Sequence, residues 1–318
     1  MSRQSAGLLE EFRQSWRTTL IVAVVSCLLG ATTGFGYVQL RFIGVTGSPT
    51  ETVQRYLLAI AQNDSVRALQ EVAHRPADTS LLTDEALRSA HLDNPMSGIA
   101  VTQTRSPRVP VSFLLGTTRV ETVITVTAVE GVFLVDQGLA TADLTQARSL
   151  GVGIQAGGRG VTADAVPVFP GIYPVTTGDS RLALKPGGYV KAVDVGGTAA
   201  PPAQELALTD SGLTSIRGAA QAQIAACAEV SNPAPAGCPF SADDSTTYRS
   251  GTATWVSLSD PSVSAEVVAE ASADITVSGR MRFTAVVAAT GKNHSEQVSF
   301  TSPGKVDLRN RDWRITWE

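Results

Sequence analysis

Hydrophobic side chains follow three patterns along this chain. Residues 18–40 form one apolar run without a charged side chain. Between residues 48 and 90, apolar positions recur every three or four residues, which is typical of amphipathic helices. From residue 99 onward, apolar positions mostly alternate with polar ones, as in half-buried strands, apart from one helical stripe after residue 210. The patterns therefore predict an anchor followed by mixed helix and strand.

The apolar run is predicted to cross a membrane once. As a helix, residues 18–40 would be roughly 34 Å long at about 1.5 Å per residue, which spans about 30 Å of hydrocarbon. Trp16 and Tyr37 flank the run, where aromatic rings favour the membrane interface. The alternatives are a buried core helix, a cleaved signal peptide and a bacterial lipoprotein. The last would be lipidated on Cys27, because Val24–Cys27 is similar to a lipobox, although the residues after Cys27 stay apolar.

Flanking charges and cysteines together predict the orientation of this segment. Three arginines precede it, and Arg41 and Arg55 follow, so the positive-inside bias is weak. Cys227 and Cys238 lie close together in the remaining chain and would suit a structural disulfide in an oxidising compartment, with two free thiols as the alternative. We therefore expect residues 1–17 in the cytoplasm and the bulk of the chain outside the cell.

Three helices followed by four strands are predicted between residues 48 and 138. Ser48–Glu51 has the features of a capped helix start, Asn63–Ser65 separates this helix from a second, and a third covers residues 81–90. The predicted strands are 99–104, 109–115, 120–129 and 132–136. This order is typical of an α+β unit with helices on one face of a curved antiparallel sheet.

Two sequences in this segment carry a resemblance to a known family. They are S-P-x-E-x-V-x-x-Y-L-x-A-I-A-x-N-D at residues 48–64 and LLTDEAL at residues 81–87. Both resemble the NTF2-like, cone-shaped domains found outside the membrane in many bacterial proteins. The resemblance implies a pocket between sheet and helices, in which some relatives use Asp, His or Tyr for isomerisation or hydrolysis. The candidates here are Tyr56, expected in the core, and His74 and His91, expected at the surface.

The next stretch is rich in glycine and poor in helix signals. Residues 139–200 contain short apolar segments separated by Pro-Gly and Gly-Gly pairs, which predict a small β module. Gly151–Gly153 does not have the spacing of a nucleotide-binding loop, so a turn-rich strand connection is the better interpretation. The sequence TAAPPA at residues 198–203 is the best candidate for a linker.

A helix and a sheet are predicted for residues 206–318. Thr209–Ser211 can cap a helix with an apolar stripe that ends at Cys227. The stripe consists of Leu213, Ile216, Ala220, Ile224 and Cys227. Every odd position from 265 to 277 is apolar, which predicts one half-buried strand, and similar alternation follows in residues 281–287 and 313–317. We therefore expect a second α+β unit, fastened by a bond between Cys227 and Cys238.

A second resemblance spans nearly the whole chain. It rests on IAACAEVSNPAPAGCPF at residues 224–240, FPGIYPV at residues 169–175 and the single apolar run before them. These features resemble a group of uncharacterised single-pass membrane proteins of high-GC Gram-positive bacteria. The resemblance implies an exported multidomain architecture with a cysteine pair and no assigned activity.

The predicted organisation has five segments. They are a cytoplasmic juxtamembrane segment (1–17), a transmembrane helix (18–40), an NTF2-like α+β domain (48–138), a small Gly-rich β module (139–200) and a C-terminal α+β domain with the cysteine pair (206–318).

Composition and motifs narrow the function classes. The chain has 318 residues, of which 43% are hydrophobic and 17% charged, which is too apolar a composition for a disordered chain. Its net charge of −4 argues against nucleic-acid binding. We find no catalytic motif, and Asp243–Asp244 is interpreted as a solvated turn. We therefore predict no catalytic residue, cofactor or metal ligand.

The expected function is that of a membrane-anchored, extracytoplasmic binding or scaffold module whose partners are the lipid bilayer and an envelope component. Two alternatives stay open, namely a regulatory partner of another membrane protein and an envelope enzyme that uses the NTF2-like pocket.

Overall fold

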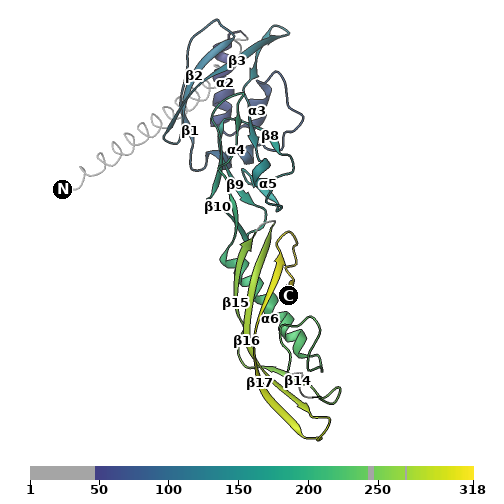
Figure 1. Cartoon of the computed structure of the whole chain (residues 1–318). Coiled ribbons are helices and arrows are strands. Elements are labelled where there is room, and N and C mark those ends of the chain that lie inside the picture. Colours follow the sequence, from purple (N-terminus) through teal and green to yellow (C-terminus); the bar gives the residue numbers. More distant parts are fainter. Residues whose placement is uncertain (1–46, 243–246, 269–270) are drawn as a thin grey trace, which may run out of the picture. The chain divides into compact units, whose positions relative to one another are not determined.

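Helices and mostly antiparallel sheets make up residues 47–242, 247–268 and 271–318, the part of the chain that this computed structural model describes (Figure 1). The predicted α+β class is therefore confirmed. The predicted membrane span at residues 18–40 and the segment before it lie outside the described residues. Among the residues that are described, no helix is both long enough and apolar enough to cross a membrane.

Three helices and a four-stranded antiparallel sheet form the first part of the fold. The helices are α2 (Pro49–Ala61), α3 (Ser65–Gln70) and α4 (Asp84–His91). The strands are β1 (Met96–Val101), β2 (Arg108–Leu115), β3 (Thr118–Val129) and β4 (Val132–Gln137), hydrogen bonded in the order β1-β2-β3-β4. Helix α2 packs against all four strands. Each predicted helix and strand of this part is present, and β1 begins three residues before its predicted start.

Side-chain caps explain where two of these helices begin. The Asp64 carboxylate accepts a hydrogen bond from the backbone N–H of Arg67 at 3.0 Å, and the Thr83 hydroxyl accepts one from Ala86 at 3.2 Å. Each bond satisfies an amide of the first helical turn that has no partner within the helix. On α2, the predicted apolar stripe is Val53, Tyr56, Leu57, Ile60 and Ala61; the first four are fully buried and Ala61 is half-buried.

Nine short strands and one helical turn follow. The strands are β5 (Ala140–Asp143), β6 (Ile154–Ala156), β7 (Arg159–Val161), β8 (Ala165–Val168), β9 (Gly171–Thr177), β10 (Leu182–Lys185), β11 (Gly188–Ala192), β12 (Thr198–Ala199) and β13 (Glu205–Leu208), and the helical turn is α5 (Thr145–Arg148). They form three small sheets with the orders β11-β9-β6-β7, β12-β5-β8 and β10-β13. Apolar residues of all three sheets contribute to one buried cluster, including Ala142, Tyr173, Leu184 and Val190.

The helical part and the Gly-rich part share buried surface. Helix α4 packs against β9, and Leu81 and Ala86 belong to the same core as Tyr173. Conversely, Phe169 of the Gly-rich part belongs to the core around Tyr56 in the helical part, and the centroids of these two rings lie 6.3 Å apart. Short strands with few apolar residues gain stability by packing on helices, so the two stretches bury each other's surface.

The predicted linker is part of the folded structure, so this prediction is wrong. Thr198 and Ala199 form β12, which pairs in parallel with β5. Pro201 and Gln204, just after β12, are also buried. The proline and alanine content of this segment suggested a linker. The segment instead forms a short strand and a turn that lie against the small β module.

The C-terminal part contains the longest elements. Helix α6 (Asp210–Ala228) packs on a five-stranded antiparallel sheet of β14 (Thr254–Ser257), β15 (Ser262–Val268), β16 (Ser272–Val286), β17 (Asn293–Asp307) and β18 (Ile315–Trp317). β16 pairs with β17 along its whole length, and β14 and β15 share its other side. The buried residues of α6 are Gly212, Ile216, Ala220, Ile224 and Cys227, so the predicted stripe is right except that Gly212 replaces Leu213.

One predicted strand is in fact two. The alternation between residues 265 and 277 covers the end of β15 and the start of β16, which pair antiparallel. Ala271, directly before β16, lies in a turn and has a φ of 53°, in the left-handed region that turns favour and strands exclude. The odd-numbered residues of both strands lie on the same face of the sheet, because Ala265 lies opposite Ile275 and directly opposite residues share one face.

Two glycines of α6 are predicted to respond in opposite ways to alanine. At Gly212 an added Cβ would lie 2.3 Å from the backbone oxygen of Arg181, whereas at Gly218 it would meet nothing within 4 Å. Gly212→Ala should lower the free energy of unfolding by about 2 kcal/mol through overpacking. Gly218→Ala should raise it by about 0.5–1 kcal/mol because alanine loses less backbone entropy in a helix. Urea unfolding of both variants checks this, and equal midpoints would contradict the close approach of α6 to Arg181, the residue before β10.

Candidate functional site

Tyr56, the first of the predicted pocket residues, is a core residue, as expected. Its side chain is fully buried, and its hydroxyl donates a hydrogen bond of 2.5 Å to the backbone oxygen of Gly138. Burial raises the pKa of Tyr56 well above its ordinary value, and the neighbouring Tyr173 acts in the same direction. The phenol is therefore protonated and serves to tie α2 to the end of β4.

His91 is buried, so the predicted surface position of this residue is wrong. Only 6% of it is exposed, and its Nδ1 lies 2.8 Å from Oδ1 of Asn63. Gly171 of β9 lies close to the ring, since a Cβ added there would be 3.5 Å from Nε2. The cause is the packing of α4 on β9, which covers a helix end that sequence alone leaves exposed.

His74 is exposed, as expected, but it has an acidic partner that its sequence neighbourhood does not reveal. Its Nδ1 lies 3.3 Å from Oδ1 of Asp136, with 79% of the histidine side chain exposed. An isolated parallel bridge between Val72 and Val135 brings the two residues together. Exposed pairs of this kind contribute little stability. In the described part of the chain, no contact joins Tyr56, His74 and His91 into one site.

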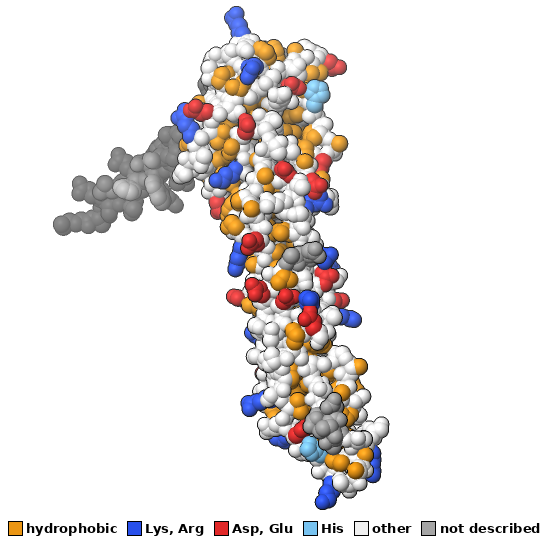
Figure 2. All heavy atoms as spheres, viewed as in Figure 1, with side chains coloured by type: hydrophobic (Ala, Val, Ile, Leu, Met, Phe, Trp, Pro, Cys, Tyr) orange, Lys and Arg blue, Asp and Glu red, His pale blue; other side chains and the backbone are white. Residues whose placement is uncertain are grey.

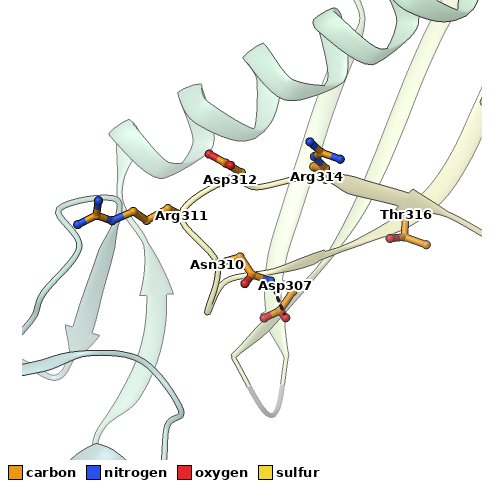
Figure 3. A pocket seen from close by; sticks show the side chains of 6 residues that line it. All are labelled: Asp307, Asn310, Arg311, Asp312, Arg314 and Thr316. Carbon is orange, nitrogen blue, oxygen red and sulfur yellow. Dashed lines mark hydrogen bonds between the residues drawn. The ribbon is translucent and has the colours of Figure 1, made fainter. Parts of the chain in front are cut away.

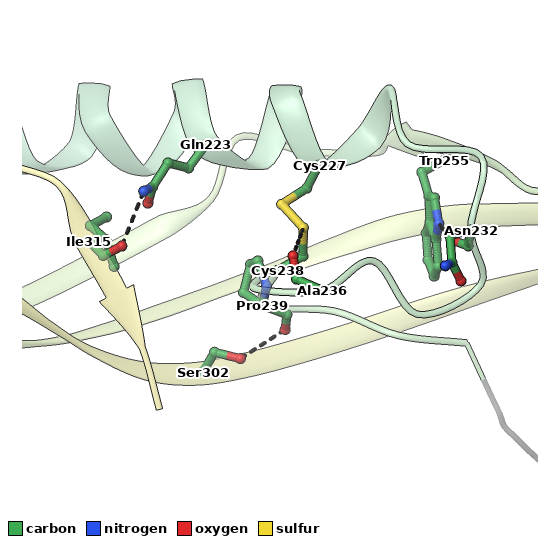
Figure 4. The surroundings of a disulfide bond; sticks show 9 residues. All are labelled: Gln223, Cys227, Asn232, Ala236, Cys238, Pro239, Trp255, Ser302 and Ile315. Carbon is green, nitrogen blue, oxygen red and sulfur yellow. Dashed lines mark hydrogen bonds between the residues drawn. A yellow bond between two sulfur atoms is a disulfide. The ribbon is translucent and has the colours of Figure 1, made fainter.

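The two predicted disulfide cysteines lie at bonding distance. The sulfur atoms of Cys227, at the end of α6, and Cys238 are 1.98 Å apart (Figure 4). The bond closes the loop that follows α6 and returns it to the helix. The position of Cys227 on the buried stripe, which the sequence predicts, explains why the loop is held beneath the helix rather than beside it.

Further contacts hold this loop over one face of the sheet. The Ser302 hydroxyl of β17 donates to the backbone oxygen of Pro239 at 2.8 Å, and the indole N–H of Trp255 donates to that of Asn232 at 2.9 Å (Figure 4). The Phe240 ring lies between two sheet aromatics, with its centroid 4.7 Å from that of Trp255 and 5.7 Å from that of Phe300. We call residues 229–242 the disulfide loop; it acts as a lid on the C-terminal core.

A polar hollow of about 420 Å³ lies beside the last strand (Figure 3). Two carboxylates, two guanidinium groups, an amide and a hydroxyl line it: Asp307, Asp312, Arg311, Arg314, Asn310 and Thr316. Asp307 is already engaged, because its carboxylate accepts hydrogen bonds from the Asn310 amide at 3.1 Å and from the Arg309 side chain at 3.2 Å. The other side chains in Figure 3 point in different directions and do not converge on one atom.

The loop that forms this hollow is anchored by Arg181, the residue before β10. The guanidinium of Arg181 lies 3.9 Å from the centroid of the buried Trp313 ring and donates a 3.0 Å hydrogen bond to the backbone oxygen of Arg311. Asp179 accepts hydrogen bonds from the same guanidinium, which lowers the pKa of its carboxyl. Stacking and hydrogen bonding together fix Arg181, so the loop is held in one conformation.

This hollow is lined by groups suited to polar recognition. Its groups can donate and accept hydrogen bonds, but its lining contains neither a histidine nor a cysteine to act with a nucleophile. In the described ranges, no group of three His, Cys, Asp or Glu side chains could hold a metal ion. The signal for this site in the sequence is the dense charge of residues 309–314, RNRDWR, which sequence analysis did not single out. Asp243–Asp244, the other acidic feature, lies outside the described residues.

Comparison with known proteins identifies no relative: no protein-family model, curated protein or solved structure matches the chain.

The burial of His91 predicts a loss of stability in acid. Burial lowers the pKa of His91 because it disfavours the imidazolium, with the Pro170 backbone acting in the opposite direction. The unfolded chain therefore binds this proton more readily than the folded chain does. The contribution of His91 to the free energy of unfolding is fully present above a pH of about 6.5. Below that pH the free energy of unfolding falls by up to about 1.4 kcal/mol per pH unit. Urea unfolding between pH 7.5 and 5.5 should show a smaller loss for His91→Gln than for the unmodified chain.

His74→Gln is the matched control for this experiment, because it makes the same chemical change at an exposed ring. It should keep the pH dependence of the unmodified chain. A pH dependence that disappears in His74→Gln and persists in His91→Gln would contradict the assignment.

Proposed function

We propose that this protein is a membrane-anchored, extracytoplasmic module of the cell envelope that binds or scaffolds other envelope components and performs no catalysis. In this proposal residues 18–40 cross the membrane, residues 1–17 lie in the cytoplasm and the described part of the chain lies outside the cell. The same proposal includes an NTF2-like domain at residues 48–138 and membership of the group of uncharacterised single-pass membrane proteins of high-GC Gram-positive bacteria.

The bond between Cys227 and Cys238 is the observation that carries this proposal. Its two sulfur atoms lie 1.98 Å apart in a loop that is otherwise rich in proline and short of regular structure. Structural disulfides persist in oxidising compartments outside the cytoplasm. Closing a loop of this size is worth about 3 kcal/mol in the chain-entropy model, so the lid of the C-terminal core would depend on that compartment.

Two further observations support binding over catalysis. Two of the three groups that could act in an NTF2-like pocket are used in packing: Tyr56 hydrogen bonds to Gly138 and His91 contacts Asn63. The third, His74, is exposed at the surface beside Asp136. On the face shown in Figure 2, acidic and basic side chains are interspersed and no field of one sign gathers. A surface of this kind suits a polar envelope component or protein better than a nucleic acid.

Export and oxidation of the chain can be measured together. Protein from intact cells is denatured, alkylated without a reducing agent and analysed by mass spectrometry. We expect Cys227 and Cys238 to be unlabelled before reduction and labelled after it. External protease should cleave the described part of the chain in cells with an intact membrane.

Cys238→Ser is the matched control, because it should leave Cys227 open to alkylation without reduction. A labelled Cys227 in the unmodified chain, together with full protection from external protease, would place the bulk of the protein in the cytoplasm and end the proposal.

A further inference from the structure

Two segments of the first sheet are held beside the start of helix α2. The Thr50 hydroxyl, in the first turn of α2, donates a hydrogen bond of 3.3 Å to the backbone oxygen of Thr104 and accepts one of 3.2 Å from its N–H. The Thr52 hydroxyl donates to the backbone oxygen of Phe133 at 3.1 Å. The loop between β1 and β2 (residues 102–107) and the turn between β3 and β4 therefore lie at the end of the fold where α2 begins.

In the proposed function this end of the fold is tied close to the bilayer. The predicted span ends at residue 40 and α2 begins at Pro49, so nine Cα–Cα steps join them. Whatever conformation these residues adopt, the steps cover at most about 32 Å. The headgroups on each side of a bilayer take up roughly 5–8 Å of that distance. The start of α2 therefore stays within roughly 25 Å of the headgroup surface.

Two arginines without an acidic partner lie at this end. Arg105 is in the loop between β1 and β2, Arg108 is the first residue of β2, and both are exposed. Neither guanidinium group has a hydrogen bond or an ion pair with another residue in the described part of the chain. Arg119, toward the other end of the same sheet, instead forms an ion pair of 2.8 Å with Glu121. Two arginines at the end where α2 begins are thus available to a partner outside the fold.

These groups fit the headgroups of anionic lipids. A guanidinium group donates two parallel hydrogen bonds to phosphate oxygens and stays charged at physiological pH. Val129, beside the turn between β3 and β4, is 39% exposed and offers an apolar side chain at the same end. Cationic and apolar side chains that face one surface are the combination that binds the interface of an anionic bilayer.

Two carboxylates at the same end limit the strength of such a contact. Glu51 lies half-buried in the first turn of α2, and Glu130 is exposed in the turn between β3 and β4. A carboxylate is repelled by anionic headgroups, so this end does not amount to a polybasic patch that binds a membrane by itself. The anchor supplies what is missing, because it holds the two arginines near the lipid at a raised effective concentration.

We propose that the loop between β1 and β2 lies on the membrane surface, with Arg105 and Arg108 bound to the phosphate groups of anionic lipids. This contact gives the folded part a second attachment to the bilayer, which limits how far it can turn about its anchor. The inference rests on the proposed function, because it requires residues 18–40 in the membrane.

Quenching of a fluorescent dye in reconstituted vesicles measures the contact. The full chain carries Cys27→Ser, to remove the other thiol, and the dye is attached at Gln103→Cys, an exposed loop position. The vesicles contain phosphatidylcholine alone or mixed with phosphatidylglycerol, and spin-labelled headgroups quench a dye that lies at the surface. We expect strong quenching in the anionic vesicles only, and its loss in high salt, because salt screens the attraction. A dye at Thr117→Cys, in the turn between β2 and β3, should escape quenching.

Charge variants test which side chains make the contact. Arg105→Gln and Arg108→Gln should each lower the ratio of contacting to free loops about fivefold. Glu130→Gln should raise this ratio, and Arg119→Gln is the matched control that should leave it unchanged. Urea midpoints equal to that of the unmodified chain show that the variants fold. Equal quenching in both kinds of vesicle, or a loss that follows Arg119→Gln instead of Arg105→Gln and Arg108→Gln, would overturn the proposal.

Flotation of the vesicles after alkaline extraction distinguishes the two ways in which the experiment can fail. A chain that stays in the vesicles while the dye at Gln103→Cys remains unquenched retains its anchor, and refutes the lipid contact alone. A chain that is extracted from the vesicles has no membrane span, which overturns the proposed function and the contact together.

Discussion

The C-terminal part of this protein depends on the unbroken pairing of β16 with β17. Fifteen consecutive residue pairs without a bulge keep every odd residue of β16 on one face of the sheet. That face holds the buried residues Ala273, Ile275, Val277, Met281, Phe283 and Ala285. A slip of one residue would turn all of them to solvent, so this ladder fixes what the helix and the loop must cover.

The cover comes from two elements of different kinds. Helix α6 supplies a narrow stripe of small and branched residues, which cannot by itself shield a face as wide as five strands. The disulfide loop closes the rest with Phe240, held against Trp255 and Phe300. Gly279 makes this possible, since an added Cβ would lie 2.7 Å from the Phe300 ring that rests on it. The bond from Cys227 therefore acts on packing as well as on chain entropy, because it holds an aromatic side chain in the core.

Local signals in the sequence predicted the parts of this fold that depend on local physics. The Thr209 cap, the buried residues of α2 and the alternation along β16 follow from spacing that any short segment carries. The contacts of His91 with Asn63 and Gly171 depend instead on α4 packing against β9. No local pattern reports that contact, so the residue seemed exposed.

The same limit explains the other differences between sequence and structure. Thr198 looked like a linker because its pairing with β5 lies far away in the chain and is parallel. Ala271 looked like one more strand residue because a hairpin preserves the alternation that defines a strand. The polar hollow was not predicted, because Asp307 and Thr316 are brought together only by the turn between β17 and β18. The motifs of known catalytic and metal sites, which mostly contain histidine or cysteine, do not mark these residues.

The two sides of the C-terminal sheet differ in how they are completed. β14 and β15 are short, divide one side of β16 between them and contact α6. β17 pairs with β18 at residues 304–306 alone among the described strands. Phe300 and Val306 of β17 are nevertheless buried in the same core as the stripe of α6. Burial at this strand therefore depends on the helix and the disulfide loop that cover its inner face, rather than on a further strand beside it.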